Sequence, residues 1–376
     1  MSSTPSIDLE LLRALVDEPA GSYDVEHLER GNALLAAHME AHGLRVVSFA
    51  LPERAAVLVG ERTLGSGEGP VITLVGHLDT VWPAGSVDRW RMDVDADADR
   101  ISGPAVGDMK AALLMAVEAI ARAASATAGD GTLRLVVIPD EEVGSVDSRP
   151  LLEQLADTTD LCLGLEAGKA DGAVVASRGA VGAMRVESRG NAVHVTEPGG
   201  INAVDPLVDL LSDVTALSSP DVQVSVCHVR GGDSRQVSAP TAMFEVDLRA
   251  DEARHLDDAV AAIRRTVARA DASFAGTVIS RGGATRPAFP SSASAPVLEA
   301  IGRTGHVLPR TMHERGGSDA SFFAARGVPT LDGLGPWCEG NCTRDERIVL
   351  SSIETRIALM ADLMRLWIDD RIERSA

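Results

Sequence analysis

Three short aliphatic runs in the first half of the chain each end in residues that can bind a metal ion or transfer a proton. The runs cover residues 71–76, 133–138 and 161–165. The polar residues that follow them include His77, Asp79, Glu141, Glu142 and Glu166. Imidazole and carboxylate are ligands of catalytic zinc, and a carboxylate that does not bind the metal can serve as a general base. One imidazole among several carboxylates, two of them adjacent, therefore indicates a co-catalytic metal site.

Each of these signals also has a simpler structural interpretation. A histidine two residues from an aspartate, as in His77 and Asp79, is often only a hydrogen-bonded pair. Asp108 follows a glycine and precedes a helical pattern, so it could be the N-cap of that helix. The acidic residues 140–142 could lie in a solvated turn, and Glu166 could be an exposed strand end. The metal site is favoured because all of these residues occur together.

The elements that must position these residues follow an α/β pattern. The aliphatic runs are typical of buried strands, and a helical pattern from Asp108 to Ala124 lies between two of them. Strands that alternate with helices indicate a sheet with many parallel strands, which binds ligands beyond the carboxyl ends of those strands. We therefore expect the polar clusters to converge at one edge of the sheet.

A different order of elements follows from about residue 179 to residue 283. Strands are expected at 181–188, 222–229, 243–248 and 277–280, and helices at 202–217 and 252–270. This βαββαβ order is that of a ferredoxin-like domain. Afterwards the α/β pattern resumes with a helix from Ala295, a strand at 328–331 and a helix at 352–368. The predicted organisation is a catalytic domain of residues 1–177 and 286–376, with an inserted domain of residues 178–285.

Composition and charge argue against several classes of function. The chain has 376 residues, a formal net charge of −20 and only 3% aromatic residues, so a nucleic-acid partner is not expected. The apolar stretch at 111–124 contains Glu118 and Arg122 and is not a membrane span. Residues 1–12 lack the features of a secretory signal, and 4 cysteines are too few for a disulfide framework. We therefore expect a cytoplasmic protein.

Eight short motifs occur in the order and spacing of one enzyme family. They are GHLDTVWP, GPAVGDMKAAL, PDEEVGS, LGLEAG, GNAVH, TRPAF, GGSDAS and DGLGP. The chain resembles the dizinc metallopeptidase family of glutamate carboxypeptidase, aminoacylase, acetylornithine deacetylase and succinyl-diaminopimelate desuccinylase, and its motifs are most similar to those of glutamate carboxypeptidase. The resemblance covers nearly the whole chain. It implies a zinc-peptidase-type mixed sheet flanked by helices, with a ferredoxin-like βαββαβ lid and dimerisation domain inserted into it.

The resemblance also implies roles for individual residues. The implied zinc ligands are His77 and Glu166 for the first ion, Glu142 for the second ion, and Asp108 as a bridge between them. Asp79 would orient His77, and Glu141 would be the general base. In the inserted domain, His194 would reach into the site of a partner subunit and stabilise the oxyanion. Arg286 would grip a substrate carboxylate, and Gly317 and Ser318 would line the substrate pocket.

Two positions depart from the family pattern. Gln236 stands where the family usually carries an asparagine that helps to hold the substrate, so the pocket is expected to be reshaped. Cys342 stands where the family carries the histidine that completes the second zinc site, and no histidine follows His313. Cysteine is a competent zinc ligand. Alternatively, Cys342 is a neutral thiol and the second zinc is weak or absent, or Cys338 competes for the metal.

These observations predict zinc-dependent hydrolysis of an amide or peptide bond next to a free carboxylate, of the carboxypeptidase or N-acyl amino acid amidohydrolase type. One or two Zn²⁺ per chain, a small-molecule substrate with a carboxylate and a homodimer are expected. One alternative keeps the scaffold but uses one zinc or an altered acyl-transfer step. A non-catalytic binding protein is disfavoured because the matching ligands and the general base are all present.

Overall fold

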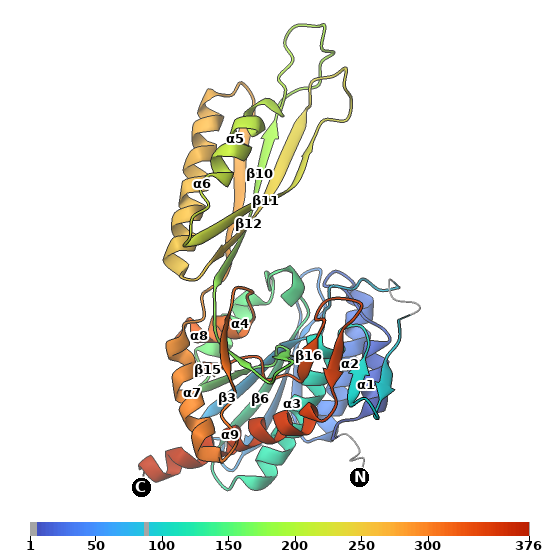
Figure 1. Ribbon diagram of the computed structural model, residues 1–376, viewed down its shortest axis with the longest axis vertical. Helices are drawn as coiled ribbons and strands as arrows, with labels where there is room; N and C mark the ends of the chain where they lie inside the picture. The colour runs from blue at the N-terminus through green and yellow to red at the C-terminus, as the bar shows by residue number, and fades with distance from the viewer. Residues whose placement is uncertain (1–5, 86–89, 376) are drawn as a thin grey trace. The chain divides into compact units, whose positions relative to one another are not determined.

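The computed structural model describes residues 6–85 and 90–375, which belong to two compact units (Figure 1). The first unit comprises Met1–Ser177, Phe289–His313 and Ser318–Ala376. The second unit comprises Arg178–Ala288 and Glu314–Gly317. Each unit has its own hydrophobic core. Among the residues described, no helix is long and apolar enough to cross a membrane.

A six-stranded mixed sheet forms the centre of the first unit. In spatial order its strands are β1 (Arg45–Phe49), β2 (Val57–Leu64), β6 (Gly131–Ile138), β3 (Val71–His77), β7 (Leu161–Gly164) and β15 (Thr330–Leu331). β1, β2 and β6 pair antiparallel, whereas β6, β3, β7 and β15 run parallel. The three aliphatic runs form β3, β6 and β7, and the predicted mixed sheet flanked by helices is confirmed.

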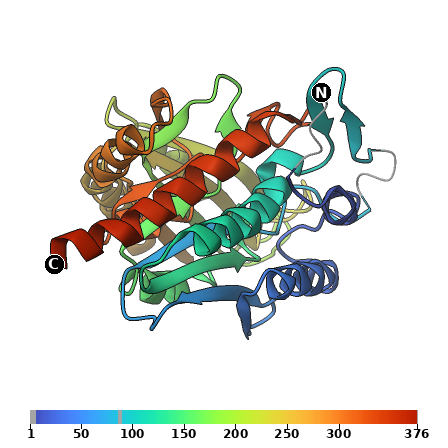
Figure 2. The same cartoon turned by 90° about the horizontal axis from the view of Figure 1, so that it is seen from below.

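Helices cover both faces of this sheet. They are α1 (Leu9–Val16), α2 (Val25–Ala41), α3 (Ala111–Ala126), α4 (Arg149–Ala156), α7 (Ser291–Thr304), α8 (Ala320–Ala324) and α9 (Ser352–Ser375). Successive strand residues point to opposite faces. Leu133 and Leu135 of β6 therefore join the main core with α3 and α9, which lie side by side in Figure 2. Val136 and Ile138 join a separate core with α4 and α8.

A five-stranded sheet joins segments of the first unit that are far apart in the sequence. Its strands are β4 (Asp93–Asp95), β5 (Arg100–Ser102), β17 (Arg347–Val349), β16 (Trp337–Glu339) and β8 (Gly168–Lys169). β5 pairs antiparallel with β17, and Ile101 lies opposite Ile348. Asp108 follows β5 and residues 340–346 directly precede β17, so this pairing brings the two segments together. A separate two-stranded sheet contains β9 (Val174–Arg178) and β14 (Thr311–Glu314).

The second unit is a four-stranded antiparallel sheet packed against two helices. In chain order its elements are β10 (Ala180–Arg189), α5 (Asp205–Thr215), β11 (Val222–Gly231), β12 (Thr241–Ala250), α6 (Ala253–Ser273) and β13 (Thr277–Arg286). The strands lie in the order β11-β12-β10-β13. The predicted βαββαβ order is confirmed. The strand predicted at 277–280 continues to Arg286, because it pairs with β10 as far as Val181.

Candidate metal centre

At the carboxyl ends of β3 and β6, three side chains come close enough to share one metal ion. His77 is the last residue of β3 and lies opposite Ile138, the last residue of β6. Glu142 lies in the short helical turn Glu141–Val143 that follows β6. One ligand atom each from His77, Asp108 and Glu142 lies within 4.8 Å of the other two. These three residues form the candidate metal group.

His77 is buried, and both of its ring nitrogens face hydrogen-bond acceptors. Nδ1 donates to the backbone oxygen of Asp79 at 2.9 Å. Nε2 lies 3.1 Å from Oδ1 of Asp108 and 4.0 Å from Oε1 of Glu166. Burial alone would lower the pKa of His77, but hydrogen bonds with Asp108 and Asp79 raise this pKa well above its usual value. The ring is thus oriented with Nε2 toward the carboxylates, as a metal ligand requires.

Asp79 contacts His77 and also the turn that carries Glu141 and Glu142. Its Oδ1 lies 3.4 Å from Nδ1 of His77. The same carboxylate accepts the backbone N–H of Glu141 at 3.1 Å and that of Glu142 at 3.0 Å. The hydroxyl of Ser22 donates to Oδ2 at 2.7 Å. Asp79 therefore fixes the turn that carries both glutamates, a role that the sequence motif did not indicate, and Ser22 was missed because it lies outside every motif.

The pKa of Glu142 reflects its burial among other charged side chains. Burial raises that pKa to about 8. The charge on His77 opposes the shift, whereas the carboxylates of Asp108 and Glu141 add to it. Metal ligands bind in their deprotonated form, and a cation offsets the repulsion among neighbouring carboxylates. The imidazole and carboxylate donors of this site therefore fit a divalent cation.

Asp108 lies in an irregular helical turn, Val106–Lys110, and is not the N-cap of α3, so the alternative interpretation of Asp108 as an N-cap is wrong. The regular helix α3 begins at Ala111, with Lys110 as its N-cap. Asp108 has φ −120° and ψ 85°, and it lies inside a turn that a bond from the Lys110 N–H to the oxygen of Ala105 closes. With this backbone, Oδ1 faces His77 and Oδ2 faces the segment 340–346.

Two side chains of the segment 340–346 contact the candidate metal group. Nδ2 of Asn341 donates to Oδ2 of Asp108 at 3.1 Å. Sγ of Cys342 lies 3.1 Å from the same oxygen. Burial, together with the charge on Asp108, raises the pKa of the Cys342 thiol. The thiol of Cys338 instead donates to the backbone oxygen of Glu339 at 3.6 Å. Asn341 is a site residue that the sequence analysis missed.

The predicted site residues of the second unit fall in two places. His194 is exposed, and it forms an isolated antiparallel bridge with Val237. The backbone N–H of Val195 donates to the oxygen of Gln236 at 3.0 Å, so His194 and Gln236 lie on adjacent segments. Arg286, in contrast, is buried at the end of β13.

The loop at residues 316–319, which precedes α8, carries the last two predicted pocket residues. A Cβ atom at Gly317 would lie 2.6 Å from Cγ of Arg286, so glycine permits close packing against that side chain. The hydroxyl of Ser318 is buried and donates to Oδ2 of Asp332 at 2.6 Å. In this structure Ser318 therefore fixes its loop through a buried hydrogen bond.

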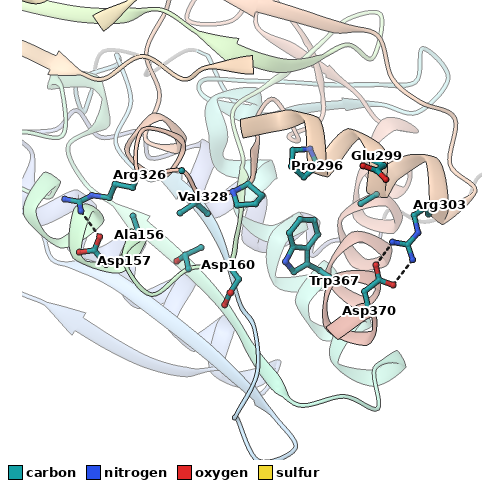
Figure 3. Close-up of a pocket in the computed structure, with 14 residues that line it drawn as sticks. Ala156, Asp157, Asp160, Pro296, Glu299, Arg303, Arg326, Val328, Trp367 and Asp370 are labelled. Atoms are coloured by element: carbon teal, nitrogen blue, oxygen red, sulfur yellow. Dashed lines mark hydrogen bonds and ion pairs between the residues drawn. The ribbon is translucent and has the colours of Figure 1, made fainter. Parts of the chain in front are cut away.

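A cavity of about 650 Å³ lies away from the candidate metal group (Figure 3). Figure 3 shows two ion pairs at its sides, Arg326 with Asp157 and Arg303 with Asp370. Asp160 in its wall directly precedes β7, whereas Glu166 lies two residues after the other end of that strand. The cavity is thus at the opposite edge of the sheet, and the chemistry of the site is assigned to the candidate metal group.

Comparison with known proteins shows which family and which solved folds the chain is similar to. The sequence pattern of the peptidase family M20/M25/M40 matches residues 73–366. Carboxypeptidase G2 from Pseudomonas sp. (strain RS-16) is 23% identical, over 95% of this chain and 88% of that protein. A tripeptidase structure from Staphylococcus aureus subsp. aureus Mu50 aligns with a TM-score of 0.75 and 20% identity, over 96% of this chain and 99% of that chain.

A second solved structure is described as a dinuclear metal-binding peptidase of the M20 family from Bacillus subtilis. It aligns with a TM-score of 0.66 and 16% identity, over 96% of this chain and 97% of that chain. At this level of identity the two structural likenesses establish a shared fold.

Proposed function

Because the chain belongs to the peptidase family M20/M25/M40, and so is a metallo-hydrolase, we propose that it hydrolyses an amide or peptide bond next to a free carboxylate. The observation that carries this proposal is the candidate metal group next to Glu141, on a turn that Asp79 holds. The name of carboxypeptidase G2 supports this type of bond.

Zinc is the proposed metal, because imidazole and carboxylate are its usual ligands in catalytic sites. The residues that would hold one or two ions are His77, Asp108, Glu142, Glu166 and Cys342. Bound zinc lowers the pKa of a coordinated water and polarises a carbonyl oxygen of the substrate. The description of the Bacillus subtilis neighbour as dinuclear supports two ions per chain.

Glu141 would move the proton in this reaction. It would take a proton from the attacking water while the oxygen bonds to the carbonyl carbon, and then give the proton to the nitrogen as the carbon–nitrogen bond breaks. The backbone N–H groups of Glu141 and Glu142 are both held by Asp79. Glu141, the proposed base, and Glu142, a proposed metal ligand, are therefore held at a fixed position relative to each other.

Arg286 would bind the free carboxylate of the substrate. The residue is only 3% exposed, and a guanidinium can hold a carboxylate through two charge-assisted hydrogen bonds. Gln236, from the segment next to His194, would contact the same substrate and reshape the pocket relative to family members with asparagine at this position.

Substrates with a free carboxylate should therefore be preferred. We expect N-acyl amino acids and dipeptides to be hydrolysed faster than their carboxyl-amidated counterparts. Arg286→Ala should raise KM for the free acids about 10- to 100-fold, from the loss of bonds to a charged group, and should leave the amidated compounds nearly unchanged. Arg185→Ala is a control on the exposed side of β10. If Arg286→Ala impairs free acids and amides equally, Arg286 has a structural role.

Cys342 is the proposed replacement for the usual histidine of the second zinc. The contact of its Sγ with Oδ2 of Asp108 at 3.1 Å supports this role, since Asp108 is the expected bridge between the ions. Zinc binding would require loss of the thiol proton, against a pKa that burial and Asp108 raise. A thiolate also adds negative charge near Asp108 and Glu142, and so should make the second ion a weaker Lewis acid.

Zinc content distinguishes a Cys342 ligand from a neutral thiol. Cys342→Ser is expected to lose roughly one zinc per chain, because serine is a poor zinc ligand. Cys342→His should restore the family's ligand and keep two ions. Cys338→Ser is the matched control, since that thiol bonds to the backbone of Glu339. Elemental analysis of the four proteins decides the question, and unchanged zinc in Cys342→Ser would favour a one-metal site.

We also propose a homodimer formed through the second unit, with His194 of one subunit stabilising the oxyanion at the metal group of the other. The exposure of His194 in its own unit supports this arrangement. The purified chain should then have a mass in solution near twice 39.3 kDa. A single-chain mass would contradict it. A cytoplasmic location stays a prediction from the sequence.

A further inference from the structure

Glu346 connects the segment that carries Asp108 with the segment that carries Cys342. Its side chain is buried, with 1% of the residue exposed. Oε1 accepts the backbone N–H of Gly107 at 2.8 Å and that of Asp108 at 3.1 Å. Oε2 accepts the backbone N–H of Cys342 at 3.3 Å. One carboxylate thus joins segments whose contacting side chains are 234 residues apart in the chain.

Both segments have backbone conformations that need such a partner. Gly107 and Asp108 precede the first regular turn of α3, and Asp108 has non-helical dihedral angles. Cys342 has φ 58°, in the left-handed region that non-glycine residues rarely occupy. The N–H groups of Gly107 and Asp108 are buried, and a buried N–H that loses its acceptor is strongly unfavourable. The three bonds to Glu346 therefore stabilise the conformations that place Sγ of Cys342 beside Oδ2 of Asp108.

We propose that Glu346 is a positioning residue for the metal site, acting through the backbones of Asp108 and Cys342. This inference rests on the metal site of the proposed function. Glu346 contacts the backbone of these residues, so its effect would be on how tightly the site holds zinc. Outer-shell partners of metal ligands commonly set affinity in this way.

The arrangement requires a group with two acceptor oxygens. A carboxylate is acceptor-only and can bond to the N–H groups of both segments at the same time. In glutamine one oxygen becomes an NH₂ donor, which would face a backbone N–H of one segment. Aspartate keeps both oxygens but is one methylene shorter, so it cannot span the same distance without a shift of the backbone.

Zinc affinity of the full-length chain tests the inference. The parent, Glu346→Gln, Glu346→Asp and Asp160→Asn would be compared in competition with a chromogenic zinc chelator. Asp160 is the matched control, because its carboxylate accepts the backbone N–H of Val71 at 2.9 Å, at the start of the strand that ends in His77. We expect both Glu346 variants to bind zinc about 10- to 100-fold more weakly, with activity recovered in excess zinc. Asp160→Asn should bind like the parent.

The other possible results contradict either the positioning role of Glu346 or the proposed function. If the parent binds zinc and the Glu346 variants bind it equally tightly, Glu346 does not position the site. The same conclusion follows if Asp160→Asn loses as much affinity, since the effect would then be general destabilisation. If Glu346→Gln does not fold, Glu346→Asp alone decides. A parent chain that binds no zinc overturns the proposed function together with this inference.

Discussion

Glu141→Gln is expected to lower turnover by a factor of about 10² to 10⁴ while the zinc content stays that of the parent. Glutamine has nearly the same shape as glutamate but cannot accept the proton from the attacking water. Glu141 is adjacent to Glu142 yet is not a member of the candidate metal group, so its replacement should spare metal binding. The measurement is kcat on an N-acyl amino acid, together with zinc per chain by elemental analysis.

Glu142→Gln is the matched contrast to this variant. Glu142 belongs to the candidate metal group, so the same chemical change one residue away should lower zinc content and activity together. The backbone N–H groups of Glu141 and Glu142 both donate to the carboxylate of Asp79. Both variants therefore keep the hydrogen bonds that fix the turn. If Glu141→Gln loses zinc in proportion to activity, Glu141 is a ligand rather than the base.

Much of the fold could be predicted because its strands have a simple pattern. Apart from Arg134, the run at 133–138 is aliphatic on both faces, since it is a central strand with Leu133 and Leu135 in one core and Val136 and Ile138 in another. The ends of elements were less predictable. The strand at 277–280 extends to Arg286 through pairing with β10, a contact between distant segments that leaves no local pattern.

Some residues of the candidate site could likewise be predicted from the sequence, and others could not. His77 and Glu142 follow predicted strands, so the sequence alone indicates that they meet at one sheet edge. The helical pattern near Asp108 was misleading, because tertiary hydrogen bonds to Glu346 favour a non-helical backbone there. Asn341 and Ser22 act through single contacts from loops, and no spacing rule predicts such contacts.

Removal and return of the metal ion tests the central claim, hydrolysis at a zinc site, most directly. Exhaustive chelation should lower hydrolysis of an N-acyl amino acid by about 100-fold or more, because water without a metal has a pKa near 15.7 rather than near 7. One to two equivalents of Zn²⁺ should restore it, because the metal group has both imidazole and carboxylate donors. Chelator already saturated with zinc is the control, and circular dichroism verifies that the chelated chain is folded. Undiminished hydrolysis by a folded chain freed of metal would contradict the account.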